Sequence, residues 1–465
     1  MRGRGVLSGV AFAALIALGA QGAKAESLAD TMVAAYRHSA LIEQNRAVLR
    51  AADEDVAAAI AALRPIVQWT ASHTISRSEG TTDYVTARNT TLQIGAQILL
   101  YDWGRSQLAI DAAKEQVLAV RQGLVSVEQD VLLDATSAYF DIQEATLRVA
   151  LQQNSVEVLS SERQAAQDRF DVGEITVTDV AQADAQLAQT QAGLAAAQGD
   201  LEVARERYLA VTGRFPGELD PPPPLPNLPA SVDEARAIGQ RNHPLIAQAQ
   251  RQAAVAELGV AQAAAERNPS LSGNIGAGIT RSPQQFTQDY DNRNSASVGL
   301  ELNQTIYSGG RLPAAHRRAM AVRDQARASL LNVSRQISEL VGVTWANISV
   351  ARAQIGAIDE QIAAAQQAYN GVREEAALGA RTTLDVLDAE QALLEARADR
   401  ITAEANLQLA HYQLLAAMGR LTVEHLNLGI PTYDPSQYYN AVRDAPYTSK
   451  QGESLDRVLR AIGRD

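Results

Sequence analysis

Residue types that catalyse reactions or hold metals occur in this chain, but their spacing forms no recognised site. The six histidines stand at positions 38, 73, 243, 316, 411 and 425, without the spacing of paired zinc ligands on a helix. Neither the G-x-S-x-G turn nor the phosphate-binding G-x-x-x-x-G-K loop occurs. Residues 289–292 begin like a calcium loop, but Asn294 and Leu300 stand where glycine and glutamate are needed. The sequence therefore predicts no enzyme, no metal site and no cofactor.

Asp385 and Asp388 are the acidic pair with the most informative spacing. They stand three residues apart at an expected helix start, so they share one helix face near the positive end of its dipole. Repeated in three copies around a narrow mouth, they would favour cations and repel anions. In isolation, they would only stabilise the first helical turn, and the spacing alone leaves both roles open.

The composition of the 465-residue chain indicates long helices rather than large globular cores. Aromatic residues make up 5% of the chain, and alanine is abundant. The net charge of −12 argues against nucleic acid as a partner, because phosphate binding needs a basic face. The absence of cysteine excludes disulfides and the lipid-acceptor residue of a bacterial lipoprotein.

The first 25 residues have the features of a secretory signal peptide. Arg2 and Arg4 precede a short apolar run at 6–19, and residues 23–25 read Ala-Lys-Ala, a small-x-small cleavage site. The alternative, a membrane anchor, needs about 18 continuous apolar residues, which no stretch provides. We therefore expect a mature chain that begins at Glu26 and leaves the cytoplasm without a helical anchor.

An internal repeat organises the chain. A shift of 206 residues places Tyr101 on Tyr307 and Gly173 on Gly379, and nearer the start of each half the shift is 204. Prolines at 221–224, 226 and 229 separate the halves as a stiff linker. The predicted divisions are a signal peptide at 1–25, a first repeat at 26–220, a linker at 221–230, a second repeat at 231–430, and a polar, poorly ordered tail at 431–465.

Each half is predicted to hold a helix, two strands, a very long helix and a shorter helix. The first helices are expected at 27–63 and 232–267, and the long ones at 105–172 and 311–378, each roughly 100 Å in length. Apolar residues recur every seven positions along the long helices, as at Val131, Ala138 and Ala145. This period indicates left-handed coiled-coil packing.

The predicted strands lie at about 66–78, 90–101, 270–280 and 295–307, and each has two different faces. Apolar residues such as Ile94 and Ile98 alternate with polar or small ones such as Gln93 and Gln97. Segments of this kind are typical of a membrane barrel, with lipid outside and water inside. The alternative is a pair of soluble hairpins packed on a core. Four strands cannot close a barrel, whereas two copies would give a filled barrel of eight and three would give twelve with a pore.

The sequence resembles the TolC-like outer-membrane efflux and secretion channels over about residues 26–428. Matching motifs stand at the strand–helix junctions, at 101–105 and 307–311, and at the later helix turns, at 169–173 with 178–180 and at 379–389. Their order, repeated twice at matched spacing, makes the resemblance specific. The junction residues are Tyr101, Gly104, Arg105, Tyr307, Gly310 and Arg311.

The resemblance implies a mainly α fold with a small β part. Three chains would share a twelve-stranded β-barrel, continuous with a coiled-coil tunnel that crosses the periplasm and closes at its tip. Gly173 and Gly379 would form the tip turns, and Arg381 would bond Thr178 and Asp179 of a neighbouring subunit.

At the same tip, Asp385 and Asp388 would ring the entrance. The tyrosine typical of the family three residues before the second-half glycine is Ala376 here, which predicts fewer bonds holding the tip.

The predicted function is export through a channel in the bacterial outer membrane. The channel would receive proteins (type I secretion) or small molecules from a periplasmic adaptor and an ATP- or proton-driven inner-membrane translocase. Two other classes remain open from sequence: a periplasmic coiled-coil adaptor and a non-transporting envelope scaffold. The missing lipidated cysteine favours protein cargo slightly.

Overall fold

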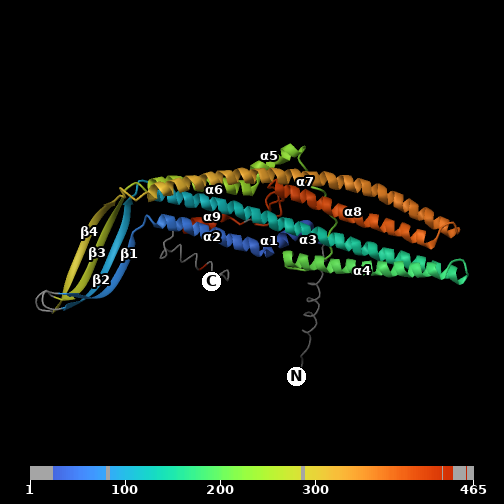
Figure 1. The fold of residues 1–465 in the computed structure, drawn as a ribbon, viewed down its shortest axis with the longest axis horizontal. Coiled ribbons are helices and arrows are strands. Elements are labelled where there is room, and N and C mark those ends of the chain that lie inside the picture. Colours follow the sequence, from blue (N-terminus) through green and yellow to red (C-terminus); the bar gives the residue numbers. More distant parts are fainter. Residues whose placement is uncertain (1–24, 80–83, 284–288, 432, 444–456, 458–465) are drawn as a thin grey trace, which may run out of the picture. The chain divides into compact units, whose positions relative to one another are not determined.

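The computed structural model describes residues 25–79, 84–283, 289–431, 433–443 and 457 (Figure 1). All but the last residue of the predicted signal peptide lies outside the described residues. The helices and strands follow the same order twice, as the repeat predicts. Their bounds are α1 Leu28–His38, α2 Ala40–Ala61, β1 Ile66–Glu79, β2 Tyr84–Tyr101, α3 Arg105–Asp171, α4 Val177–Thr212, α5 Val232–Asn242, α6 Pro244–Ala265, β3 Ser270–Pro283, β4 Tyr290–Asn303, α7 Arg311–Ala377, α8 Thr383–Ala417 and α9 Pro435–Val442.

The helix expected at the start of each half is in fact two helices. Ser39 is extended and separates α1 from α2, and its hydroxyl accepts a hydrogen bond from the backbone N–H of Ile42. His243 is extended and separates α5 from α6, because the proline ring of Pro244 disfavours helical backbone at the preceding residue. Proline at the first position of α6 is well placed, since no hydrogen bond is lost there.

The described residues divide into two compact units, and each unit is built from three separate segments of the chain. The first comprises residues 25–43, 126–243 and 336–431 and is helical. In it, the predicted seven-residue stripe of α3 is buried at Val131, Ala138 and Ala145. Ala138 and Ala145 pack with Tyr208 of α4, whose hydroxyl lies 2.9 Å from the hydroxyl of Thr31 in α1. Small residues on the stripe allow the helices to approach closely.

The second unit holds the sheet, most of α2, all of α6 and α9, and parts of α3 and α7. The tail was expected to be poorly ordered, but its residues 435–442 form α9. Tyr433 and Tyr439 pack against Leu49, Val56 and Val117 of α2 and α3. This apolar contact, which the polar composition of the tail obscures, explains why the segment is folded.

The four strands form one antiparallel sheet in the order β1-β2-β3-β4. Strands β2 and β4 begin earlier than predicted, because backbone pairing continues past the apolar positions into polar ones. Strand β4 ends at Asn303 and not at 307, because Asn303 pairs with Ser270 and the next partner would be Pro269, which has no N–H. Among the described residues, no helix has the length and apolar character needed to cross a membrane.

Candidate functional site

The register of the sheet gathers its apolar side chains on one face. Trp69 pairs with Ile94, Ile94 with Ala277, and Ala277 with Ala296. Paired residues point to the same side, so this row and the rows two residues away share a face. Ile94 and Ile98, which were named above as apolar positions, belong to it, and so does Val298 of β4. Ile94 and Val298 are exposed.

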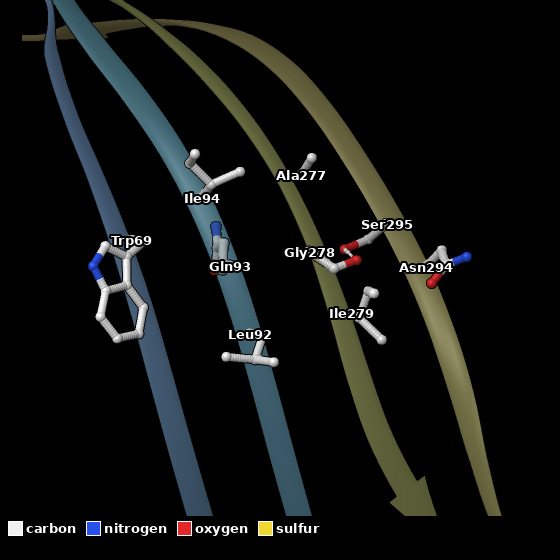
Figure 2. A pocket seen from close by; sticks show the side chains of 9 residues that line it. All are labelled: Trp69, Leu92, Gln93, Ile94, Ala277, Gly278, Ile279, Asn294 and Ser295. Carbon is white, nitrogen blue, oxygen red and sulfur yellow. Dashed lines mark hydrogen bonds between the residues drawn. The ribbon is translucent and has the colours of Figure 1, made fainter.

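The opposite face is built of small and polar residues. Thr70 pairs with Gln93, Gln93 with Gly278, and Gly278 with Ser295. A side chain at Gly278 would lie 3.0 Å from the backbone oxygen of Leu92, so β3 and β2 approach closely there. The apolar face, in contrast, has a shallow hollow of about 510 Å³ that is lined by residues of all four strands, most of them apolar, such as Trp69, Leu92 and Ile279 (Figure 2). No charged residue is among those that line this hollow.

Both outer strands of the sheet expose an unpaired edge within one chain. Strands β1 and β4 stand at the two ends of the strand order, and every residue of each is exposed. A long, exposed edge of this kind presents a row of backbone donors and acceptors to another strand.

The predicted junction residues form two matching turns between strand and helix. Gly104 and Gly310 have positive φ angles of 87° and 91°. At the first turn, Asp102 accepts a hydrogen bond from the backbone N–H of Ser106 at 2.7 Å. At the second, Ser308 occupies the position equivalent to Asp102 and accepts from the backbone N–H of Leu312 at 3.2 Å. Arg105 and Arg311 begin α3 and α7.

Tyrosine and tryptophan side chains surround these junctions. The rings of Tyr101 and Trp103 meet edge to face at 4.7 Å, and both are exposed. Tyr307 is 88% exposed. Amphipathic aromatic rings are enriched where membrane barrels meet the lipid–water interface, so the exposure of these rings is compatible with the barrel that the sequence predicts.

The two predicted tip turns have the same geometry. Gly173 and Gly379 adopt positive φ angles of 81° and 76° after α3 and α7, where a left-handed residue ends a helix. Thr176 then opens α4, and its hydroxyl and backbone N–H both donate to Oδ2 of Asp179, at 2.7 Å and 2.9 Å. Thr382 opens α8 with equivalent bonds to Asp385, at 2.8 Å and 2.9 Å. Both aspartates thus complete capping boxes.

These bonds favour the charged form of the two aspartates. The bonds from Thr176 lower the pKa of Asp179, and those from Thr382 lower the pKa of Asp385. Asp388 lies one turn later, is exposed and takes no part in the capping box. The structure therefore separates the acidic pair into a helix cap, Asp385, and a solvent-facing carboxylate, Asp388.

Within one chain, Arg381 contacts Glu375 and not the predicted acceptors. Its Nε lies 2.8 Å from Oε2 of Glu375, and both side chains are about half exposed (51% and 53%). Thr178 is exposed on α4. The predicted bonds to Thr178 and Asp179 involve a neighbouring subunit, so they stay a prediction.

Ala376 lies in a buried cluster with Tyr369, Val386 and Leu393. Its carbonyl accepts a bond of 3.4 Å from Nη1 of Arg169 on α3. Sequence reasoning did not predict this bond from Arg169, nor the ion pair between Arg381 and Glu375. It also missed Thr176 and Thr382, although the Thr-x-x-Asp spacing of a capping box was available at both turns.

Comparison with known proteins identifies the fold described above. The model of the family described as Outer membrane efflux protein matches residues 33–214 and 239–420, one stretch in each half. The chain belongs to this family. It is 35% identical to the outer membrane efflux protein BepC of Brucella suis over 91% of this chain and 92% of BepC. It is 24% identical to the outer membrane protein TolC of Escherichia coli over 95% and 93% of the two chains.

A crystal structure of CusC, a protein described as forming a transmembrane channel, has the same fold. It aligns with a TM-score of 0.74 at 19% identity and covers 84% of this chain and 92% of the CusC chain. The predicted family and the mainly α, duplicated fold are confirmed. The comparisons also confirm the predicted function: the chain is an export channel of the outer membrane. They favour this function over the two alternatives, a periplasmic adaptor and an envelope scaffold. Its family consists of channel proteins and not of enzymes.

Proposed function

We propose that three copies of the chain form one closed, twelve-stranded barrel through which cargo leaves the cell. The observation that carries this proposal is a sheet with one apolar face, one polar face and two open edges. Open edges are not tolerated in lipid, so the edges of β1 and β4 need partner strands. Because neighbouring strands alternate in direction, β4 of one copy can continue antiparallel onto β1 of the next. Three copies leave a pore, whereas two would give a filled barrel.

The helix tips would close the periplasmic end of this passage. In this arrangement, Arg381 exchanges Glu375 for Thr178 and Asp179 of the neighbouring subunit. The capping bonds of Asp179 use its Oδ2 atom, so Oδ1 would receive the guanidinium. Asp385 and Asp388 of three subunits would then surround the entrance and favour cations.

The energy for transport would come from partners. The sequence has no phosphate-binding loop, so we propose that the channel works with a periplasmic adaptor and an inner-membrane translocase driven by ATP or protons. Cargo would be proteins or small molecules. Export of a secreted protein and of a dye, compared in cells that lack this chain, would distinguish the two.

Cross-linking tests the shared barrel directly, because the natural chain has no cysteine. One cysteine replaces Thr70 on the polar face of β1, and a second is moved along the polar face of β4 through Ser295, Ser297 and Gly299. When the two cysteines are opposite each other, oxidation should link neighbouring chains, and a denaturing gel should show linked products of up to three chains and none larger. A control pair at Gln93 and Gly278, which are neighbours within one sheet, should give single chains only. Linked products of at most two chains, or no linked product at any β4 position, would contradict the trimer.

A further inference from the structure

We propose that the apolar face of the sheet ends in a binding site for the phosphate groups of outer-leaflet lipids, formed by Arg77, Arg88 and Arg281. The site rests on the proposed barrel, because it requires that this face be turned toward lipid. All three side chains are exposed. They come from three adjacent strands, β1, β2 and β3.

The three arginines follow directly after the apolar rows. The last row that is mainly apolar contains Ala71, Leu92 and Ile279, and the next row contains His73, Thr90 and Arg281. Arg88 lies in the second row beyond the apolar band, paired with Ile75, and Arg77 lies in the third, paired with Thr86. The arginines therefore occupy three successive rows just beyond the apolar band, one on each of three adjacent strands.

The height of the apolar rows fits the hydrocarbon layer. On β4, they extend from Leu302 to the row of Asn294, which is eight residue steps or roughly 27 Å along the strand. Barrel strands are tilted by about 35–45°, so these rows span roughly 20 Å across the membrane, close to the apolar band of about 25 Å in known barrels. The arginines then lie at the level of the lipid headgroups.

The arginines are at the strand ends that face away from the helices. The opposite end of β2 carries Tyr101 and leads into α3, and the opposite end of β4 is followed by Tyr307 and then α7. Because the helices of the proposed channel lie in the periplasm, the arginine end reaches the outer leaflet. Headgroups there bear phosphate, and clusters of basic residues at a membrane surface bind anionic headgroups.

The chemistry of this face suits phosphate. A guanidinium group donates a fork of N–H groups that matches phosphate oxygens, and its charge does not depend on pH in the physiological range. The guanidinium of Arg281 lies 5.6 Å from the ring centre of Tyr290 on β4, which limits its orientation. In the row of Arg281, Nδ1 of His73 lies 2.8 Å from Oγ1 of Thr90.

The charge balance of the face is positive. Among the described strand residues, the acidic side chain on this face is Glu79, at the last position of β1. Asp291 and Arg293 belong to the opposite face. Three arginines against one glutamate in each chain become nine against three around the proposed barrel.

Lipid binding by the full-length protein in detergent tests this site. The probe is a bis-phosphorylated outer-leaflet glycolipid, compared with the same lipid after removal of its phosphates, with bound copies counted by native mass spectrometry. We expect the natural protein to prefer the phosphorylated lipid by roughly a hundredfold, from three arginines per site. The variant with Arg77→Gln, Arg88→Gln and Arg281→Gln should lose that preference.

The matched control is Arg293→Gln, one row from Arg281 but on the opposite face, and it should keep the preference. Equal binding of both lipids by the natural protein, or an undiminished preference in the triple variant, would overturn the site. The same spectra report the number of chains. A trimer without lipid preference removes the lipid site and leaves the proposed channel intact, whereas a monomer removes the channel architecture itself.

Discussion

The guanidinium of Arg381 and the carboxylate of Glu375 lie 2.8 Å apart across the turn between α7 and α8. This ion pair within one chain competes with the proposed bond between subunits, in which Arg381 reaches Asp179. The equilibrium between the two partners of one arginine would then decide whether the tip is held closed.

Replacing Arg381 should open the channel. Arg381→Ser removes the proposed charge-assisted bond from each of three subunits, so the closed state should lose most of its population. Conductance in a planar bilayer should rise. Glu375→Gln removes only the competitor and should leave conductance low. Equal conductance of the two variants would mean that the pair is an ordinary surface contact and that the gate is elsewhere.

Asp385 and Asp388 should differ in what they contribute. Asp388→Asn should weaken the preference for cations without affecting stability, because Asp388 takes no part in the capping box. Asp385→Asn should weaken the cation preference as well. It should also destabilise the start of α8, because the capping bonds from Thr382 to this side chain become weaker. Reversal potentials and thermal unfolding measure the two effects. A stability loss in the Asp388 variant alone would contradict this division.

The two faces of the sheet should respond differently to the same substitution. Arginine at Ile94 or Val298 would face lipid and should oppose insertion by about 2–4 kcal/mol near the midplane. Arginine at Gln93 or Ser297 would face water, so these variants should assemble and change conductance. Heat-modifiable gel mobility and single-channel recording distinguish the outcomes. If both pairs were equally tolerated, the assignment of the faces would be wrong.

Ala376 predicts a further change at the tip. Ala376→Tyr introduces the residue typical of related channels, and its hydroxyl should add a bond that lowers the open probability. The side chain must displace part of the cluster around Tyr369, so circular dichroism is needed to show that α7 remains folded. An unchanged open probability in a folded variant would indicate that the bond from Arg169 to the carbonyl of Ala376 already fills this role.

Asp53 should make stability depend on pH. It is fully buried in α2, and among the described residues its two carboxylate oxygens have no hydrogen-bond partner. Burial raises its pKa from 3.8 to about 6, despite the opposing charge of Arg121. The folded state therefore holds the proton more tightly than the unfolded state. Stability should fall as the pH rises from about 4 to 6 and stay low above that.

The difference corresponds to roughly 3 kcal/mol at most. Asp53→Asn should thus raise the unfolding midpoint at pH 7.5 and flatten the pH profile between 4 and 6. Asp55→Asn, at an exposed position two residues later, is the matched control and should leave the profile unchanged. Parallel profiles for the natural protein and the Asp53 variant would show that the buried carboxylate does not titrate in this range.

The sequence predicted those features that depend on local periodicity and on special backbone positions. Alternation placed Ile94 and Val298 on one face, and the glycines at 173 and 379 marked both tip turns. The end of α5 at His243 could have been predicted from Pro244, because a proline disfavours helix at the preceding residue. The sequence has no comparable signal for the separation of α1 and α2 at Ser39. The packing of Tyr439 on α2 and the pairing of Arg381 with Glu375 depend on tertiary contacts, which no local pattern contains.

The unpaired edges of β1 and β4 affect how a single subunit can be stable before it assembles. A chain whose backbone groups can be satisfied in lipid only by other chains has no stable membrane-inserted state of its own. Its stability in the membrane then depends on subunit concentration. Insertion should therefore follow association, with a rate that falls steeply as chains become scarce. Newly exported subunits would need protection from mispairing until two others arrive.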